Sequence, residues 1–366
     1  MTGRHSLAGL GRPPLVIDGS HGEGGGQILR TALSLAAIAG RSVRFVNIRA
    51  GRPKPGLAAQ HLTAVRAAAA LCAARVTGDA LGSVELDFAP QAPARPGSYV
   101  FDVAEARKGG SAGSVTLVLQ TVLPPLALAE GRSTVVLRGG THVDGGPSVD
   151  YAQEVWLPVL GAMGMDARLD LVRPGWFPIG QGEVVAEIAG GAAPLRPLQF
   201  RDRGAAKTLW GRATTSNLPD HVAQRMAGHA AGLLEAQARE ASIATLRTAA
   251  VATGAALFLG ADYVQGRGGA TALGARGKPA EKVAEEAVAQ LLAYDRSGAA
   301  VDSHLADQLI VPAALASGPS AFTTQRVTRH LTTNAWVVRQ FGLAEVAIAT
   351  RNDGLGIVEI APAATC

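Results

Sequence analysis

The chain is poor in cysteine and aromatic residues, and it has no long apolar run. Its 366 residues include two cysteines, Cys72 and Cys366, at no paired spacing. A disulfide scaffold or a cysteine zinc site is therefore not expected, and a reducing compartment such as the cytoplasm fits. No window of about 18 residues is both apolar and free of charge, which argues against a membrane span. Aromatic residues make up 4% of the chain, too few for a platform that stacks the bases of a long single strand.

Several catalytic signatures are also missing. The sequence has no CxxC, HExxH, GxSxG or protein-kinase signature. Lysines are few, and none lies in a KxDG-like setting. The net charge of +5 comes mostly from arginine, which prefers planar, bidentate contact with phosphate and carboxylate groups. A GC-rich genome would give the same composition, so composition alone leaves a phosphate-binding role open.

The length predicts two domains, or one domain with an insertion. Residues 1–14 lack the apolar core of a signal peptide and are predicted to form a disordered lead. Three later stretches repeat one pattern: a helix of 12 or more residues, a strand, a glycine-rich or basic turn, a second helix and another strand. We therefore expect an α/β (α+β) fold of three units, each with two helices and a four-stranded sheet, in one large pseudo-symmetric domain. This domain covers residues 15–194 and 299–366, and residues 195–298 form a smaller inserted α/β domain.

The most unusual stretch is DGSHGEGGGQILR, from Asp18 to Arg30. A predicted strand enters a glycine turn that opens a helix, which directs free backbone N–H groups and a helix dipole at an anion. It is not a P-loop, and the dinucleotide fingerprint GxGxxG fails at Gln27. A tight turn for close helix packing is the alternative. Glu23 favours the anion site, because a carboxylate among phosphate-binding groups indicates a divalent cation between them.

Three further segments carry candidate binding residues. Arg49 and Arg52 lie in a proline-stiffened loop, followed by Gln60 and His61 at the start of the next helix. A solvated basic turn is the alternative there. Further along, one polar residue interrupts an apolar helix, and an Asp-Gln pair lies in the first turn of another. A satisfied core amide and a solvated first-turn carboxylate are the alternatives for these two segments. The residues concerned are Gln120, Asp307 and Gln308.

His330 precedes a helix predicted to begin around Leu331, in the segment RHLTTN. A helix N-terminus disfavours the imidazolium form, so we expect a neutral, nucleophilic ring. It also offers N–H groups to an anion that the ring attacks. His330 has roughly the position in the third repeat that His61 has in the first, so pseudo-symmetry favours one shared cleft. Lone histidines are more often structural, and that alternative stays open from this segment alone.

Taken together, these segments resemble the RNA 3′-terminal phosphate cyclase family. The matching motifs are DGSHGEGGGQILRTALSLA, IRAGRPKPGLAAQHLTAV, GSAGSVTLVLQTVLP, HLADQL and RHLTTN, in family order from Asp18 to Asn334. The inserted segment falls where that family carries its small domain. The resemblance implies that a histidine attacks the α-phosphorus of ATP to form a histidine–AMP intermediate. AMP then passes to an RNA 3′-phosphate, and the 2′-hydroxyl closes a 2′,3′-cyclic phosphate.

The resemblance also implies partners and site residues. ATP is the nucleotide substrate, RNA 3′-phosphate ends are the second substrate, and Mg²⁺ or Mn²⁺ is needed. No membrane partner is implied, and a homodimer is one option that the sequence leaves open. His330 would be the adenylated nucleophile and Glu23 the metal ligand. The ATP pocket would comprise Gln120, His304, Leu305, Ala306, Asp307 and Gln308. The RNA phosphate and the triphosphate would be held by Arg30, Arg49, Arg52, Gln60 and His61.

Two positions depart from the family pattern, and two other functions compete. His304 stands where relatives usually carry tyrosine or another residue, and Gln181 interrupts a triple-glycine stretch. One alternative is a non-catalytic cyclase-like RNA-binding protein of ribosome assembly, but such relatives lack the nucleophilic histidine. The other is an enzyme resembling enolpyruvyl transferases, built from similar repeats. It would leave the HLTTN and LADQ segments without a purpose, so the cyclase reading is favoured.

Overall fold

The computed structural model describes residues 13–106 and 111–363. Most of the predicted disordered lead, residues 1–12, lies outside the described residues. Within the described ranges, no helix combines the length and the apolar character that a bilayer crossing requires.

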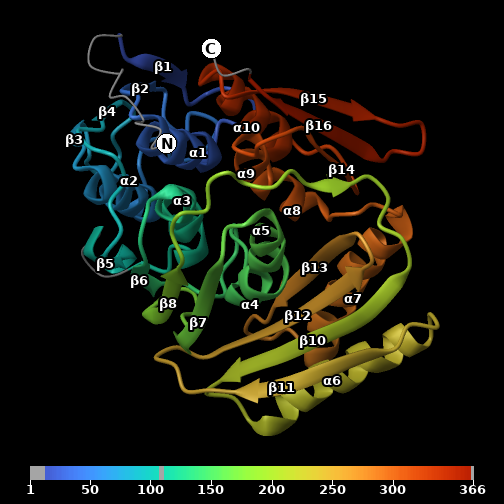
Figure 1. Cartoon of the computed structure of the whole chain (residues 1–366). Coiled ribbons are helices and arrows are strands. Elements are labelled where there is room, and N and C mark those ends of the chain that lie inside the picture. The colour runs from blue at the N-terminus through green and yellow to red at the C-terminus, as the bar shows by residue number, and fades with distance from the viewer. Residues whose placement is uncertain (1–12, 107–110, 364–366) are drawn as a thin grey trace.

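Three units of similar size follow one another along the chain (Figure 1). The first contains β1 (Leu15–Asp18), α1 (Gly26–Ala39), β2 (Val43–Val46), α2 (Ala59–Cys72), β3 (Arg75–Thr77) and β4 (Leu86–Ala89). The second contains β5 (Ser98–Asp102), η1 (Val103–Ala106), α3 (Val115–Leu128), β6 (Ser133–Gly139), α4 (Val149–Tyr151), the π-helical turn η2 (Ala152–Trp156), α5 (Leu157–Met163), β7 (Ala167–Arg173) and β8 (Gly182–Ile188). The third contains β9 (Gln199–Phe200), α8 (Ser303–Gln308), α9 (Ile310–Ala314), β14 (Ser320–Thr324), α10 (Arg329–Gln340), β15 (Ala344–Thr350) and β16 (Gly356–Pro362).

The three units share one strand topology. In each four-stranded sheet the first strand pairs in parallel with the second, the second is antiparallel to the fourth, and the fourth is antiparallel to the third. The predicted fold class, three repeated two-helix and four-stranded units, is therefore confirmed. The third unit takes its first strand, β9, from residues far before the rest of that unit.

The helices of the three units pack against one another between the sheets. Helix α1 contacts α2, α3 and α10, and Figure 1 shows these helices inside the ring of outer strands. The shared core is apolar, with Leu33, Leu119 and Val337 from α1, α3 and α10 fully buried. Burial of these helix faces brings the segment before α1 close to the segments before α8 and α10, although it precedes them by more than 200 residues.

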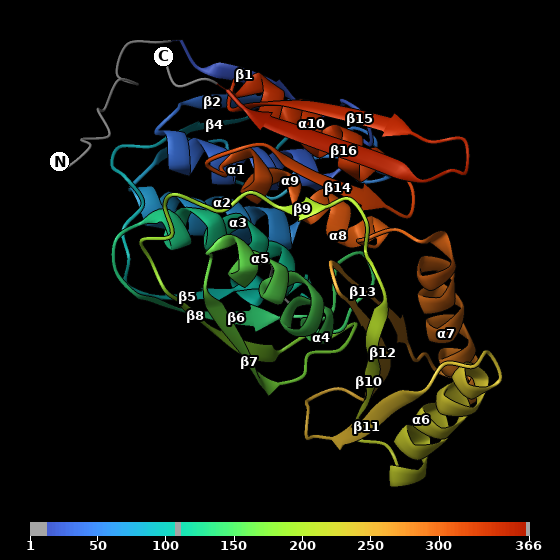
Figure 2. The ribbon, with the colours of Figure 1, turned by 45° about the vertical axis from the view of Figure 1, so that its right-hand side comes forward.

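A fourth sheet projects from one side of this three-unit part (Figure 2). It contains β10 (Ala206–Ser216), β11 (Ala241–Arg247), β12 (Gly254–Tyr263) and β13 (Gly266–Leu273), in the order β11-β10-β12-β13. Helices α6 (Asp220–Glu235) and α7 (Ala280–Ser297) pack with it around a separate apolar cluster. The assignment of residues 195–298 to an inserted domain remains a prediction. Residues 199–200, which that assignment includes, pair as β9 with β14 of the third unit.

Candidate active site

The turn before α1 consists mostly of glycines, because three other side chains lie directly on its backbone. Gly22 and Gly24 have φ values of 60° and 57°, a left-handed conformation that side chains disfavour. A Cβ atom at Gly25 would overlap the carboxylate of Glu23, and one at Gly26 would overlap His61 Nε2. At Gly22 it would overlap the Thr333 hydroxyl of α10. The turn therefore brings the first and third units into direct contact.

Glu23 is the centre of an ionic group at this contact. Its Oε2 lies 2.7 Å from His330 Nε2, and its Oε1 accepts a hydrogen bond of 2.9 Å from Arg52. The Glu23 side chain is 8% exposed, whereas that of His330 is 45% exposed. The Thr328 side chain accepts a hydrogen bond from the backbone N–H of Leu331 and caps α10, which begins at Arg329. His330 thus lies within the first helical turn, not just before it as predicted.

The pKa of His330 is shifted in the direction opposite to the sequence expectation. The hydrogen bond to Glu23 raises the pKa of His330, and the nearby carboxylate of Asp307 adds to the effect. The sequence expectation of a ring kept neutral by the helix N-terminus did not include this carboxylate, which favours the protonated ring. Burial alone would raise the pKa of Glu23, but His330 and Arg52 together lower it. The contact between Glu23 and His330 therefore holds the ring against the glycine turn.

His330 also lines a cavity of about 290 Å³, near the lower end of the range for small-ligand sites. Its wall comes from all three units and from the inserted segment. The polar side chains on it are Gln27, Arg30, Gln120, Ser148, Tyr151, Thr271, Gln290, His304, Asp307, Gln308 and His330. This group unites most of the residues predicted to bind ATP with the predicted nucleophile.

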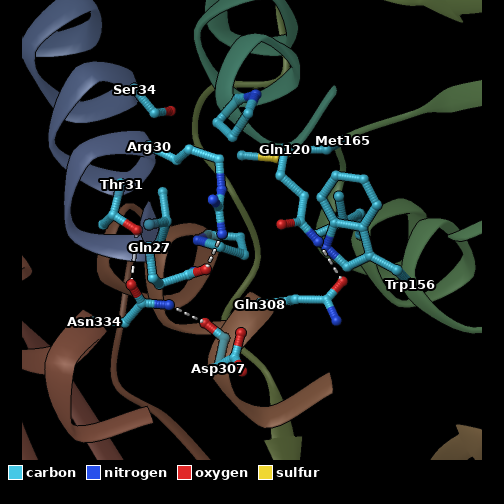
Figure 3. A pocket seen from close by; sticks show the side chains of 14 residues that line it. Gln27, Arg30, Thr31, Ser34, Gln120, Trp156, Met165, Asp307, Gln308 and Asn334 are labelled. Carbon is cyan, nitrogen blue, oxygen red and sulfur yellow. Dashed lines mark hydrogen bonds between the residues drawn. The ribbon is translucent and has the colours of Figure 1, made fainter. Parts of the chain in front are cut away.

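Arg30 is the buried cation of the cavity. Its Nη2 donates to Gln27 Oε1 at 2.6 Å, and its Nε has no hydrogen-bond partner among the described residues. Burial lowers its pKa to about 10, so it still carries a charge at neutral pH. Figure 3, a view of a smaller pocket that Arg30 also lines, shows its guanidinium group directed at the side-chain oxygen of Gln27. A buried cation with unused donor capacity is suited to an anionic ligand.

Hydrogen bonds between the units surround a smaller pocket, which shares Arg30, Gln120 and Gln308 with the cavity (Figure 3). Gln120 Nε2 donates to Gln308 Oε1 at 2.8 Å. Asn334 accepts from Thr31 Oγ1 at 2.7 Å and donates to the backbone carbonyl of Asp307 at 2.9 Å. Burial raises the pKa of the Asp307 carboxyl to about 7. This side chain is therefore partly protonated near neutral pH, and the cavity can accept anionic phosphates more easily.

The predicted phosphate-binding residues near the glycine turn lie at different depths. Arg49 Nη1 donates to the Gly56 carbonyl at 2.6 Å, and Gln60 Oε1 accepts from the backbone of Ser114 at 2.9 Å. His61 is buried under Gly26, and burial together with the charges of nearby arginines lowers its pKa well below 6.5. His61 and His330 therefore reach the same turn, but His61 does not line the cavity.

Three other predicted or noted positions also lie off the cavity wall. The side chains of Leu305 and Ala306 are fully buried in the main core, and neither residue lines the cavity. Gln181 is exposed, in a left-handed conformation with φ 56°, before β8.

The sequence missed several cavity residues. Tyr151, Ser148, Thr271 and Gln290 come from the second unit and the inserted segment. None of them lies in a motif with a recognisable spacing, so no local signal identifies them. Their place depends on how the inserted segment docks, which only the folded structure shows.

A protein-only metal cage is not present in the described ranges, where no cluster of three or more His, Cys, Asp or Glu residues is found. Glu23 still fits a Mg²⁺ or Mn²⁺ ion that is also bound by substrate phosphates, because such sites need only one or two carboxylates. Both oxygens of Glu23 already have partners. A cation there would therefore have to replace His330 or Arg52.

The comparisons with known proteins agree with the motifs. A family model described as RNA 3′-terminal phosphate cyclase matches residues 21–348. A protein of that name from Methylococcus capsulatus is 58% identical over 96% of this chain and 98% of its own length. One from Nostoc punctiforme is 51% identical over 91% and 95%, and one from Salmonella agona 44% over 89% and 92%. The enolpyruvyl transferase NikO of Streptomyces tendae shows 11% identity and a TM-score of 0.23 over 96% of this chain and 82% of its own, too low to indicate a shared fold.

The chain therefore belongs to the RNA 3′-terminal phosphate cyclase family.

Proposed function

We propose that the protein converts the 3′-terminal phosphate of RNA into a 2′,3′-cyclic phosphate, with ATP as the energy source and a histidine–AMP intermediate. The observation that carries this proposal is the position of His330. Its ring lies on the wall of a polar cavity with a buried arginine, and it also contacts the glycine turn through Glu23. Family membership supports the reaction class.

The chemistry proceeds in three balanced steps. A ring nitrogen of His330 attacks the α-phosphorus of ATP, the bond to the bridging oxygen breaks, and pyrophosphate leaves. An oxygen of the RNA 3′-phosphate then attacks the same phosphorus, the P–N bond breaks, and AMP moves to the RNA end. The 2′-hydroxyl finally attacks the terminal RNA phosphorus, loses its proton and releases AMP. Covalent catalysis replaces a poor leaving group with AMP and divides one difficult step into easier ones.

The cavity residues supply binding and charge neutralisation. Arg30 lies deepest and would hold phosphate oxygens, with Arg49 and Arg52 at the outer loop. Gln120, His304, Asp307 and Gln308 would hold the nucleoside part. Leu305 and Ala306 are core residues of α8, and Gln60 and His61 support the loops behind the wall.

Glu23 has two roles in this proposal. It is the residue that would hold the divalent cation, whose chemistry would be to neutralise charge on the triphosphate. It also holds His330 in place before the substrate binds. A ring nitrogen must be unprotonated and have a free lone pair to attack phosphorus, so Nε2 could act only after it leaves Glu23.

The scarcity of cysteine fits a cytoplasmic enzyme. Low aromatic content favours recognition of the terminal nucleotides over an extended RNA sequence.

The direct test uses ATP labelled at the α-phosphate. Wild-type protein is incubated with the label and Mg²⁺ or Mn²⁺, denatured, and examined for retained label. His330→Ala is expected to retain none and to lose cyclisation of a 3′-phosphorylated oligonucleotide, with unchanged thermal unfolding. His229→Ala on α6, outside the cavity wall, should label normally. Cyclisation by the His330→Ala variant would rule out the mechanism.

A further inference from the structure

Asp302 is a buried carboxylate that holds one end of the cavity wall without lining the cavity itself. It is 2% exposed and caps the N-terminus of α8. Its Oδ1 accepts hydrogen bonds from the backbone N–H groups of His304, at 2.7 Å, and Leu305, at 3.0 Å. His304 lies on the cavity wall. This cap therefore fixes the position of His304, which belongs to the third unit, on the cavity wall.

The second unit reaches the same carboxylate through Tyr151. Its hydroxyl donates to Asp302 Oδ2 at 2.8 Å, and the residue is 4% exposed but still borders the cavity. Tyr151 directly precedes the π-helical turn η2, in which Leu157 N–H bonds to the Ala152 carbonyl. The next residue, Pro158, has no N–H to donate and so favours this wider turn. Burial and the adjacent carboxylate raise the pKa of Tyr151 well above 10, so its hydroxyl remains a donor.

The inserted segment reaches Asp302 through strand β13. The backbone N–H of Gly269 donates to Asp302 Oδ2 at 3.0 Å. A Cβ atom at Gly269 would lie 2.9 Å from Val155 of η2, so the strand approaches the second unit closely. Two residues further on, the Thr271 hydroxyl lies 2.9 Å from that of Ser148. Gly269 and Thr271 both line the cavity, so β13 is a fixed part of its wall.

We infer that Asp302 is a positioning residue for nucleotide binding, which fixes α8, Tyr151 and strand β13 relative to one another. The inserted segment is then a functional wall of the nucleotide site. This inference rests on the proposed function, because it assumes that ATP occupies the cavity. It predicts that weakening the Asp302 contacts impairs the step that uses ATP and spares the step that uses RNA.

The Tyr151→Phe variant is the mildest way to weaken these contacts. It removes one donor and leaves Asp302 with the three backbone N–H groups. The inserted segment should stay docked, because Arg212 Nη1 still donates to Asp150 Oδ1 at 2.6 Å. Asp302→Asn is more severe, since an amide NH₂ group would face donors that need an acceptor.

A matched control exists within the inserted segment. Tyr263 is 2% exposed, and its hydroxyl donates to the buried carboxylate of Asp295 at 2.5 Å, as Tyr151 donates to Asp302. Neither Tyr263 nor Asp295 lines the cavity. Tyr151→Phe and Tyr263→Phe therefore each remove one buried phenol-to-carboxylate hydrogen bond, one beside the cavity and one away from it.

The experiment measures the two half-reactions separately. Formation of the protein–AMP adduct is followed without RNA over a range of ATP concentrations, and transfer from preformed adduct to a 3′-phosphorylated oligonucleotide is followed in a single turnover. Tyr151→Phe should raise the ATP concentration for half-maximal adduct formation by about three- to tenfold, the effect of one lost hydrogen bond. The saturating rate and the transfer rate should stay within about twofold of wild type, a split not expected from general destabilisation.

Tyr263→Phe should match Tyr151→Phe in urea unfolding and leave the ATP dependence unchanged. The inference is overturned if both variants shift the ATP dependence equally, if neither does, or if Tyr151→Phe slows transfer as much as adduct formation. Should wild-type protein form no adduct, the proposed function fails. The positioning role is then judged by ATP binding in calorimetry, which Tyr151→Phe must weaken and Tyr263→Phe must not.

Discussion

Glu23 and His330 form the contact on which the chemistry depends at the scale of single residues. Glu23 raises the pKa of the ring and lies 2.7 Å from its Nε2. This contact holds the ring in place, but it also occupies Nε2. Binding of a triphosphate must therefore change the partners of Glu23 before the first step proceeds.

Replacement of Glu23 by alanine should affect adduct formation more than transfer to RNA. We expect the rate of adduct formation at neutral pH to fall by about a hundredfold, the usual cost of one lost electrostatic contact in an active site. The pKa of His330 should also fall, so the rising limb of the residual pH–rate profile should move to lower pH. Both half-reactions are compared with those of Glu281→Ala, a carboxylate on α7 outside the cavity wall. Equal loss in both steps would count against this role.

His61 gives a second prediction, on stability. Burial, with help from nearby arginines, lowers its pKa well below 6.5 in the folded protein, so the unfolded chain binds a proton more readily. Its stabilising contribution is present above pH 6.5 and is lost as the pH falls below that value. The free energy of unfolding of His61→Gln should therefore fall less steeply than that of wild type between pH 7 and pH 5. Parallel pH profiles in urea titrations would contradict the burial of a neutral ring.

At the scale of elements, the glycine turn packs directly against the first turns of α10. Thr328 caps α10, and Thr333 of the same helix lies against Gly22. The sequence predicted a helix at this place and a histidine near its start. It could not predict the raised pKa of His330, because the responsible carboxylate lies some 300 residues earlier and meets the ring only through packing of α1 against α10.

Gly26→Ala should therefore be much more harmful than a glycine substitution elsewhere in a helix. The new methyl group would overlap His61 Nε2, and that ring is only 4% exposed and has little room to move. We expect a loss of about 1–3 kcal/mol in the free energy of unfolding. Gly228→Ala on α6, with no atom within 4 Å of the new methyl group, should add up to about 1 kcal/mol. Urea unfolding of both variants checks this contrast. If Gly26→Ala leaves the free energy of unfolding unchanged, the close contact is refuted.

At the scale of the whole molecule, the three units and the inserted segment together make one cavity. The repeats and the fold class could be predicted from the sequence, because helical periodicity and glycine turns are local signals, whereas the site residues were expected from the resemblance of their motifs to a family. Tyr151, Asp302 and Gly269 could not be predicted, since their contacts join segments more than 30 residues apart and depend on how the inserted sheet docks. Leu305 and Ala306 show the opposite case, where a contiguous motif includes side chains that face the core.

The central claim is that His330 takes AMP from ATP. Mass spectrometry of the intact protein after incubation with ATP and Mg²⁺, followed by peptide mapping under conditions that preserve the P–N bond, tests it most directly. We predict one added AMP per chain, attached to His330 and released by a 3′-phosphorylated RNA. No adduct, or an adduct on any other residue, would contradict the account.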